Sequence, residues 1–269
     1  MPDHDPKKPV LLTGASGALG RQLARQLGEA GITLRLTDIA PFPDALPPGA
    51  TFTAADLNDG VAILRLAEGC GTILHFGGVS VERPFEEVLG PNIRGLFHIY
   101  EAARREHARV LFASSNHSVG FHERTEQLDD DCTYRPDGYY GLSKVYGEMM
   151  GRLYWHKHGV ESVSVRIGSS FPEPVDARML ATWFSYGDLG RLALRVIQTE
   201  RTGCIIVWGT SKNTRMTWWR RDAREVLGWA PQDSADTWTK QLEGVTTNDP
   251  VVERHMGGAY CAMDYTRKD

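Results

Sequence analysis

The sequence lacks several features that would mark a specialised class of protein. No apolar run approaches the length of a membrane-spanning helix, and residues 1–9 are polar, without the apolar core of a secretory signal. The four cysteines show no CxxC spacing, which argues against a disulfide framework or a zinc site. With 30 basic and 34 acidic residues, the chain has a net charge of −4 and no basic excess for nucleic acid. We therefore expect a cytoplasmic protein that binds no metal, membrane or nucleic acid.

Short apolar runs and amphipathic segments alternate along most of the chain. Hydrophobic residues make up 41% of the sequence, which is enough to bury a sizeable core. This alternation predicts an α/β fold, with a Rossmann-type doubly wound parallel sheet and right-handed crossovers. The expected strands are 10–13, 34–38, 51–53, 72–76, 109–114, 161–167 and 204–209, and the expected helices are 20–27, 92–103, 140–157 and 188–199.

A glycine-rich turn follows the first expected strand. Thr13 is followed by glycines in GxxGxxG spacing, and Leu23 and Leu27 then lie on one face of a helix. A strand, glycine turn and helix in this order let the backbone approach a pyrophosphate and direct helix N–H groups at it. An ordinary glycine-rich turn is the alternative. As cofactor-binding residues we expect Gly14, Gly17, Ala18, Leu19 and Gly20.

Acidic and glycine residues stand at the ends of the next strands. Asp38 ends its strand eighteen residues after Gly20, where a carboxylate can accept hydrogen bonds from ribose hydroxyls and repel a 2′-phosphate. We therefore expect NAD and not NADP, although a solvated strand end is the alternative for Asp38. Glycines at a strand end permit close approach to a ligand, or simply form a tight turn. The further predicted cofactor residues are Ile39, Asp56, Leu57, Phe76, Gly77 and Gly78.

Tyr140 and Lys144 stand one helical turn apart in Tyr-Gly-Leu-Ser-Lys. A nearby ammonium favours the phenolate, so Lys144 is expected to lower the pKa of Tyr140 and to reach the cofactor ribose. Tyr140 can then take a proton from a substrate hydroxyl while the carbon loses hydride. A surface Tyr and Lys on a helix are the alternative.

The segment Ser114-Ser115-Asn116-His117 ends an expected strand, where ligands bind in this architecture. One of the two serines is expected to hydrogen-bond the substrate oxygen beside Tyr140, and a loop cap is the alternative. Asn116 is equally compatible with a turn, and His117 either donates to a sugar hydroxyl or satisfies loop carbonyls.

Taken together, these motifs resemble the extended short-chain dehydrogenases/reductases. The resemblance rests on TGxxGxxG at 13–20, Asp38, Asp56-Leu57, 92–95, the serine strand end and Tyr140-x-x-x-Lys144. Within that superfamily, the loops are similar to those of the uronate dehydrogenases. The segments that carry this similarity are 75–85, 112–117, 135–144, 166–169, 172–174 and 178–185. The resemblance covers most of residues 10–210 and is less clear after Trp229.

The resemblance implies a role for each matching residue. Tyr140 would be the base, with Lys144 as its partner and ribose ligand, Ser115 as the catalytic-site hydroxyl and Asn92 near Lys144, ordering a proton-relay water. Arg178 would clamp a substrate carboxylate with two hydrogen bonds, a geometry that lysine lacks; a surface salt bridge is the alternative. The implied substrate-binding residues are Ser80, Asn92, Ser115, Asn116, His117, Ser169 and Arg178.

The implied activity is oxidation of a hexuronic acid, such as glucuronate or galacturonate, at C1 to an aldarolactone with NAD. The alternatives are a sugar-nucleotide epimerase or dehydratase that holds NAD tightly, and a non-catalytic NAD-binding sensor. We expect a homo-oligomer in which residues 1–269 form one NAD-binding domain. Its small C-terminal substrate-binding lobe would be built mainly from about 169–190 and 210–269.

Overall fold

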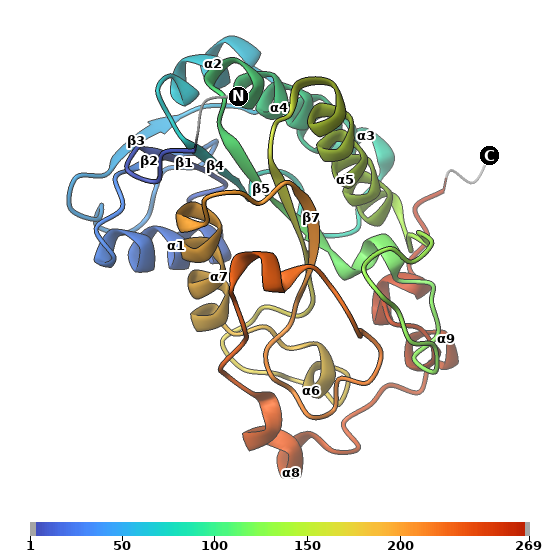
Figure 1. Ribbon diagram of the computed structural model, residues 1–269. Coiled ribbons are helices and arrows are strands. Elements are labelled where there is room, and N and C mark those ends of the chain that lie inside the picture. The colour runs from blue at the N-terminus through green and yellow to red at the C-terminus, as the bar shows by residue number, and fades with distance from the viewer. Residues whose placement is uncertain (1–3, 267–269) are drawn as a thin grey trace.

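The computed structural model describes residues 4–266 and has a seven-stranded parallel sheet at its centre (Figure 1). The order across the sheet is β3-β2-β1-β4-β5-β6-β7, so β1 lies where the strand order reverses. This topology confirms the predicted doubly wound parallel sheet. The strands are β1 (Val10–Thr13), β2 (Leu34–Asp38), β3 (Thr51–Ala54), β4 (Thr72–His75), β5 (Arg109–Ser115), β6 (Ser162–Ile167) and β7 (Cys204–Gly209).

Helices cover both faces of the sheet (Figure 1). On one face lie α1 (Ala18–Glu29) and α7 (Tyr186–Gln198), which pack against each other and share a core with the sheet. The other face carries α2 (Gly60–Ala67), α4 (Gly95–Glu106) and α5 (Tyr139–His158). In α1 and α7 the buried residues are spaced three and four apart, so each helix presents one apolar stripe to the strands.

Shorter elements build the region below the sheet in Figure 1. Here Trp208 and Trp219 stack with ring centroids 4.9 Å apart, in a small core that includes Met256. Residues 186–190 belong to α7 and lie on the sheet side of this region. The other short elements of this part of the chain are α6 (Met179–Thr182), α8 (Thr239–Leu242) and α9 (Pro250–Arg254), with 3₁₀ turns at Asn116–Val119, Arg224–Leu227, Ala235–Trp238 and Gly258–Ala262. By contrast, α3 (Phe85–Val88) and a π-helical turn (Leu89–Arg94) pack beside α5. The expected helix from residue 92 therefore becomes regular at Gly95.

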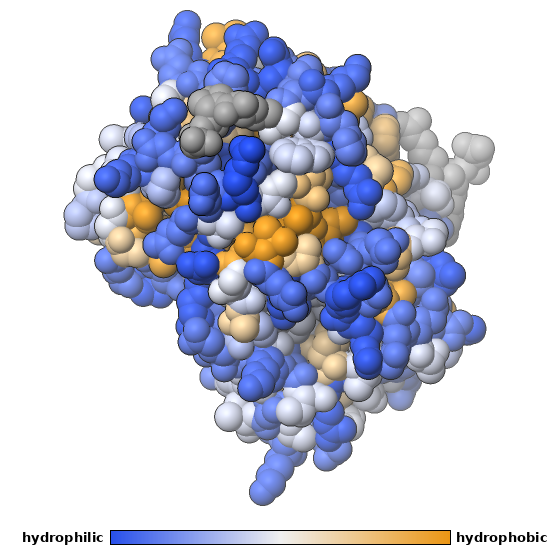
Figure 2. Space-filling model, in the orientation of Figure 1, coloured by the Kyte–Doolittle hydropathy of each residue, from blue (hydrophilic) through white to orange (hydrophobic). Residues whose placement is uncertain are grey.

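The viewed surface is mainly hydrophilic, with apolar residues gathered over the edge strand β7 (Figure 2). Within residues 4–266, no helix is long and apolar enough to cross a membrane. The cysteines at positions 70, 132, 204 and 261 are all free thiols. Residues 1–3 and 267–269 of the predicted domain lie outside the described part of the chain.

A buried ion pair joins α5 to the sheet. Glu148 on α5 accepts two hydrogen bonds from Arg166 on β6, at 3.1 and 2.9 Å, and neither side chain is exposed. The same carboxylate accepts from the Ser114 hydroxyl at 2.6 Å and from the Tyr134 hydroxyl at 2.9 Å. The Arg166 guanidinium also lies 4.9 Å from the ring centroid of Trp208. The four hydrogen bonds to this carboxylate offset the free-energy cost of its desolvation, so this contact fixes α5 in place.

Replacing Glu148 by Gln should strongly destabilise the protein, because it leaves the buried Arg166 cation without a counter-charge. The expected loss in free energy of unfolding is about 3–5 kcal/mol, measured by urea denaturation. Glu29→Gln is the control, since Glu29 pairs with Arg25 on the exposed face of α1 and should cost less than about 0.5 kcal/mol. Equal losses in both variants would contradict a special role for the buried pair.

Candidate active site

A cavity of about 1000 Å³ opens at the carboxyl ends of the strands. It brings together every residue predicted to bind cofactor or substrate except Asn92. Residues 13–14, 16–20, 37–40 and 55–58 line one part of the cavity, and 113–117 and 167–171 line another. The exposed Ser80 lies on the wall, as do residues 245–247 and 257–260. These last two segments belong to the predicted C-terminal lobe, but no residue in them was predicted to bind a ligand.

The glycine turn makes room for a ligand at the start of α1. Gly14 has φ +71°, and a Cβ there would lie 2.5 Å from the carbonyl carbon of Phe76, so only glycine fits. A Cβ on Gly20 would lie 2.0 Å from the Gly14 oxygen. Helix α1 begins at Ala18 with no acidic residue in its first turn. Its free N–H groups and partial positive charge therefore suit a pyrophosphate.

Asp38 is held at the end of β2 by backbone donors. Its carboxylate accepts from Ser16 N at 3.0 Å and from Ala40 N at 3.2 Å. Ile39 follows with 76% of its surface exposed, on the cavity wall, as expected of a side chain that can cover an adenine. Asp56 lies on the same part of the wall and accepts from Asn58 N at 2.8 Å. These residues fit the adenosine half of NAD.

The buried His75 supports the backbone where β4 ends. Its Nδ1 lies 2.8 Å from the Thr13 hydroxyl, and that hydroxyl accepts from Gly77 N at 3.2 Å. Burial lowers the pKa of His75 to about 3, and the nearby Lys144 acts in the same direction, so the ring is neutral. A neutral Nδ1 can accept from Thr13, which leaves the Thr13 oxygen free to hold Gly77 in the cavity wall. The sequence analysis gave no role to His75.

Tyr140, Lys144 and Ser115 meet in the cavity. All three are buried, with Tyr140 and Lys144 on the same face of α5. Ser115 hydrogen-bonds the Tyr140 hydroxyl. The Lys144 Nζ donates to the Ala113 carbonyl at 2.8 Å and lies 5.2 Å from the ring centroid of Tyr140. Of the two candidate serines, Ser115 reaches Tyr140, whereas Ser114 bonds Glu148.

The predicted lowering of the Tyr140 pKa by Lys144 is not found. Burial raises the pKa of Tyr140 above its usual value, and the hydrogen bond with Ser115 acts in the opposite direction. Burial also lowers the pKa of Lys144 to about 8. Because the ammonium lies over the ring and donates to Ala113, it does not approach the phenol oxygen directly.

Two residues outside the α5 motif fix the start of this helix. The buried Glu82 accepts from Tyr139 N and Tyr140 N, each at 2.8 Å, and so provides the side-chain cap that Gly138 cannot. Asn92 differs from expectation, because its amide bonds the backbone of Val79 and the Ser143 hydroxyl and does not line the cavity. This arrangement suits a residue that positions the loop against α5, and the predicted catalytic role of Asn92 stays a prediction.

His117 belongs to a cluster that the sequence revealed only in part. Its Nδ1 lies 2.6 Å from the buried carboxylate of Asp137, which fixes the ring and turns Nε2 away from that partner. The Tyr260 ring stacks on His117 at 4.0 Å and meets the Tyr140 ring edge-on at 6.1 Å. A Cβ on Gly120 would lie 1.9 Å from Asp137, so close packing holds the cluster. Of the alternatives for His117, the structure shows a carboxylate partner in place of loop carbonyls.

Arg178 provides a cation on the wall near these residues. Its Nε and Nη2 donate to the Met256 carbonyl at 2.8 and 2.6 Å, and Nη1 donates to Ser169 at 3.2 Å. With its amide oriented to satisfy both hydrogen bonds, Asn116 donates to the Ile167 carbonyl at 3.0 Å and accepts from Arg178 Nη2 at 2.9 Å. Among the described residues, no carboxylate forms an ion pair with Arg178, which contradicts the surface salt bridge considered above. Burial lowers the pKa of Arg178, although the charge of Asp176 opposes this effect.

The functional residues that the sequence analysis missed are Glu82, Asp137 and Tyr260. Asp137 stands directly before Gly138 and the start of α5, a position where an acidic residue signals a helix N-terminus. No local pattern marks Glu82 or Tyr260, because their roles depend on contacts with distant segments.

Comparison with known proteins agrees with this site. Residues 10–234 match the model of the NAD dependent epimerase/dehydratase family. The chain is 47% identical over 256 residues to the uronate dehydrogenase of Pseudomonas syringae pv. tomato, covering 94% of this chain and 93% of that protein. The chain belongs to the uronate dehydrogenases of this family. Two crystal structures of Agrobacterium tumefaciens uronate dehydrogenase are each 41% identical. The first has a TM-score of 0.91 and coverage of 98% and 100%. The second, a tyrosine mutant complexed with NAD, has a TM-score of 0.90 and coverage of 97% and 99%.

The buried Lys144 should make stability depend on pH. Its pKa falls from 10.5 to about 8 on burial, so between these pH values the unfolded chain binds more protons than the folded one. Stability therefore rises with pH across this window, by up to about 3 kcal/mol for this group. The free energies of unfolding of wild type and Lys144→Met are measured with urea at several pH values. The difference between them should change in favour of wild type from pH 8 to 10.5. Parallel curves would contradict the lowered pKa.

Proposed function

We propose that this uronate dehydrogenase oxidises a hexuronic acid, such as glucuronate or galacturonate, at C1 to an aldarolactone, with NAD as its cofactor. The observation that carries the proposal is Arg178, a partly buried cation with no ion-pair partner among the described residues. It lines the same cavity as Tyr140. Adjacent residues link the two, because Ser115 bonds Tyr140 and Asn116 bonds Arg178. A sugar acid with its carboxylate on Arg178 and its C1 hydroxyl on Tyr140 matches this arrangement.

The NAD fit rests on the glycine turn and on Asp38, which suit a pyrophosphate and an unphosphorylated ribose. When bound, NAD supplies the acceptor for the hydride that leaves C1 of the sugar. Tyr140 takes the proton of the C1 hydroxyl, and Ser115 holds the same oxygen and favours the phenolate through its hydrogen bond. His117, fixed by Asp137, and Ser169 bind sugar hydroxyls, and Ser80 closes the site from the loop after β4.

The carboxylate contact has a defined geometry on Arg178. The edge formed by Nε and Nη2 is occupied by the Met256 carbonyl. The remaining edge, formed by Nη1 and Nη2, faces Ser169 and Asn116. A substrate carboxylate that accepts from Nη1 and Nη2 either shares these donors with Ser169 and Asn116 or displaces those two acceptors. Arg178, Ser169 and Asn116 therefore all contribute to recognition of the carboxylate.

The alternative functions differ in their products. A sugar-nucleotide epimerase or dehydratase needs a binding surface for the nucleotide, whereas residues 245–260 of the small C-terminal lobe help to close this cavity. That closure favours a monosaccharide. Net NADH formation with free uronic acids supports the dehydrogenase. Turnover of UDP-sugars without net NADH supports the epimerase or dehydratase, and no reaction with any sugar supports a sensor.

The predicted homo-oligomer also stays a proposal. Leu142, Met149 and Leu153 form an exposed apolar stripe on α5, and Phe97 on α4 is exposed as well. Burial of these side chains against another copy of the chain would remove apolar surface from water. The predicted cytoplasmic location is likewise a prediction.

Replacing Arg178 tests the substrate class. Arg178→Ala should lower kcat/KM for glucuronate by the equivalent of about 2–5 kcal/mol, because a charged, two-pronged contact is lost. Arg178→Lys should recover part of this loss, since lysine lacks the planar fork. The measurement is NADH absorbance with glucuronate, galacturonate, glucose and galactose.

Neutral sugars serve as the control in that panel, since they lack the carboxylate. Wild type should barely oxidise them, and Arg178→Ala should not reduce that low rate further. Efficient oxidation of glucose by wild type, or an unchanged kcat/KM of Arg178→Ala on uronates, would overturn the assignment.

Replacing Tyr140 tests the base. Tyr140→Phe keeps the ring and removes the hydroxyl, so kcat should fall by roughly 10²–10⁴. NAD affinity, measured by titration, should stay nearly unchanged. Tyr139→Phe makes the same change one position earlier, where the ring packs on Phe85, and should keep near-normal turnover. Comparable kcat values for Tyr140→Phe and wild type would rule out this mechanism.

A further inference from the structure

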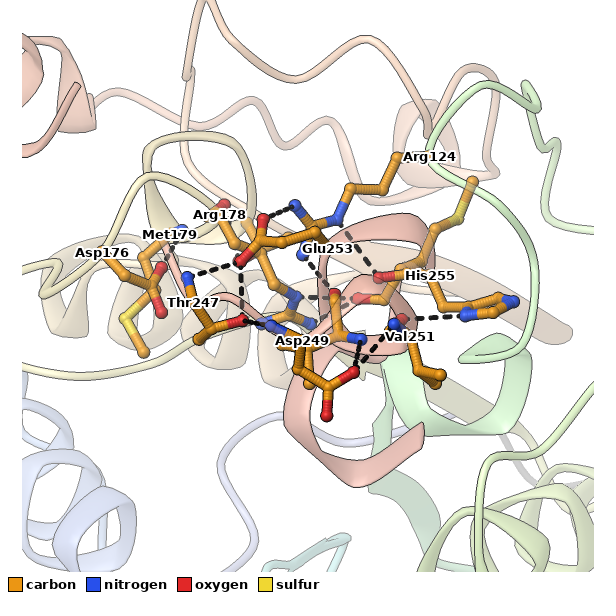
Figure 3. A network of polar contacts seen from close by, with 12 residues as sticks. Arg124, Asp176, Arg178, Met179, Thr247, Asp249, Val251, Glu253 and His255 are labelled. Carbon is orange, nitrogen blue, oxygen red and sulfur yellow. Dashed lines mark hydrogen bonds and ion pairs between the residues drawn. The ribbon is translucent and has the colours of Figure 1, made fainter. Parts of the chain in front are cut away.

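A network of polar contacts fastens residues 247–256 beside Arg178 (Figure 3). Arg124 lies in the loop after β5 and donates to three acceptors in this segment. Its Nε bonds the His255 carbonyl at 3.2 Å, Nη1 bonds Glu253 at 3.0 Å and Nη2 bonds the Val252 carbonyl at 2.7 Å. One guanidinium thus contacts two residues of α9 and the residue that follows this helix.

Glu253 extends the network to the start of the segment. Its second carboxylate oxygen accepts from the backbone and hydroxyl of Thr247, at 2.8 and 3.0 Å. Burial acts to raise the pKa of Glu253, but the hydrogen bonds from Thr247 and the charge of Arg124 bring it below its usual value. The carboxylate is therefore ionised and neutralises Arg124, which otherwise opposes the charge on Arg178.

The backbone around Arg124 also pairs with the backbone around Met256. Arg124 N donates to the Arg254 carbonyl and Met256 N donates to the His122 carbonyl, both at 2.9 Å, so the two segments pair like short antiparallel strands. The Met256 side chain is fully buried. Its carbonyl is therefore held in one place, and it accepts both donors on one edge of Arg178. Two hydrogen bonds to one oxygen fix the plane of the guanidinium.

We propose that Arg124 is a positioning residue for recognition of the substrate carboxylate, acting on Arg178 through the Met256 carbonyl. This inference rests on the proposed function, because it concerns the same carboxylate. Arg124 reaches α9 from the loop after β5, whereas Arg178 directly precedes α6, so the network joins three separate segments. Loss of the Arg124 side chain leaves Arg178 in the cavity and keeps the backbone pairing. It removes the contacts to α9 and to the His255 carbonyl, which lies next to the carbonyl that orients Arg178.

The test replaces Arg124 by Gln and separates carboxylate recognition from general damage. KM for glucuronate should rise by roughly 10- to 10²-fold, because a small displacement of a binding group suffices for such an effect. The KM for NAD should stay unchanged, and kcat should change much less than the KM for glucuronate. The ratio of kcat/KM for glucuronate over glucose should fall, which an unspecific loss of folded enzyme would not cause.

A double-mutant cycle with Arg178→Ala makes the test specific. If Arg124 acts through Arg178, Arg124→Gln should lower kcat/KM for glucuronate strongly in wild type and hardly at all in the Arg178→Ala background. Arg124→Lys should be intermediate, since one ammonium replaces only part of the fork. Arg215→Gln is the matched control, because Arg215 pairs with the exposed Glu243 in the same C-terminal region, and it should leave all constants unchanged.

Different outcomes separate the inference from the proposed function. If wild type forms no NADH with any uronic acid, the proposed function fails. If wild type oxidises uronates and Arg124→Gln loses activity equally on glucuronate and glucose, or additively with Arg178→Ala, the inference fails alone. Should Arg124→Gln not fold, as judged by NAD binding and thermal unfolding, Glu253→Gln replaces it. That change removes the counter-charge and keeps both carbonyl contacts of Arg124, and it should raise KM for glucuronate in the same selective way.

Discussion

The contact between Glu148 and Arg166 fixes the helix on which the chemistry depends. Tyr140, Lys144 and Glu148 follow one another at intervals of four on α5, so they share one face of the helix. Glu148 binds Arg166 of β6 and Ser114 of β5, and this attachment presses the same face onto the sheet. Tyr140 therefore meets Ser115 at the end of β5, and Glu82 caps the helix at the same point. The position of the proposed base follows from an ion pair two helical turns away.

The burial that holds the site residues in place also shifts their pKa values. Burial disfavours the charged forms of Tyr140, Lys144 and His75, so the pKa of each shifts toward the neutral form. The proposed base consequently depends on specific partners, such as the Ser115 hydroxyl, rather than on a nearby charge. Arg178 differs, because carbonyl and hydroxyl oxygens surround its cation, and its counter-charge is the carboxylate of the proposed substrate.

Much of the fold could be predicted because its signals are local. Strands such as 10–13 and 204–209 are short apolar runs, and the glycine turn, Asp38 and the Tyr140–Lys144 pair have fixed spacing. The parts that escaped depend on contacts between distant residues. Glu82 caps a helix fifty-eight positions later, and Arg124 bonds a carbonyl 128 positions later. The short α9 has no periodicity that would predict it. The contacts of the Asn92 amide with Val79 and Ser143 also depend on distant segments, and its catalytic role stays a prediction.

During synthesis, the residues that line the proposed cofactor part of the cavity precede those that line its C-terminal wall. Residues 13–78 and 113–144 provide the cofactor surface and the proposed base, and the sheet is complete at Gly209. The wall formed by 245–260, including the carbonyl that orients Arg178, is synthesised only afterwards. A nascent chain can therefore assemble the dinucleotide half before it can hold a sugar acid. Changes confined to the late segment can alter which sugar enters while the surface for the dinucleotide stays the same.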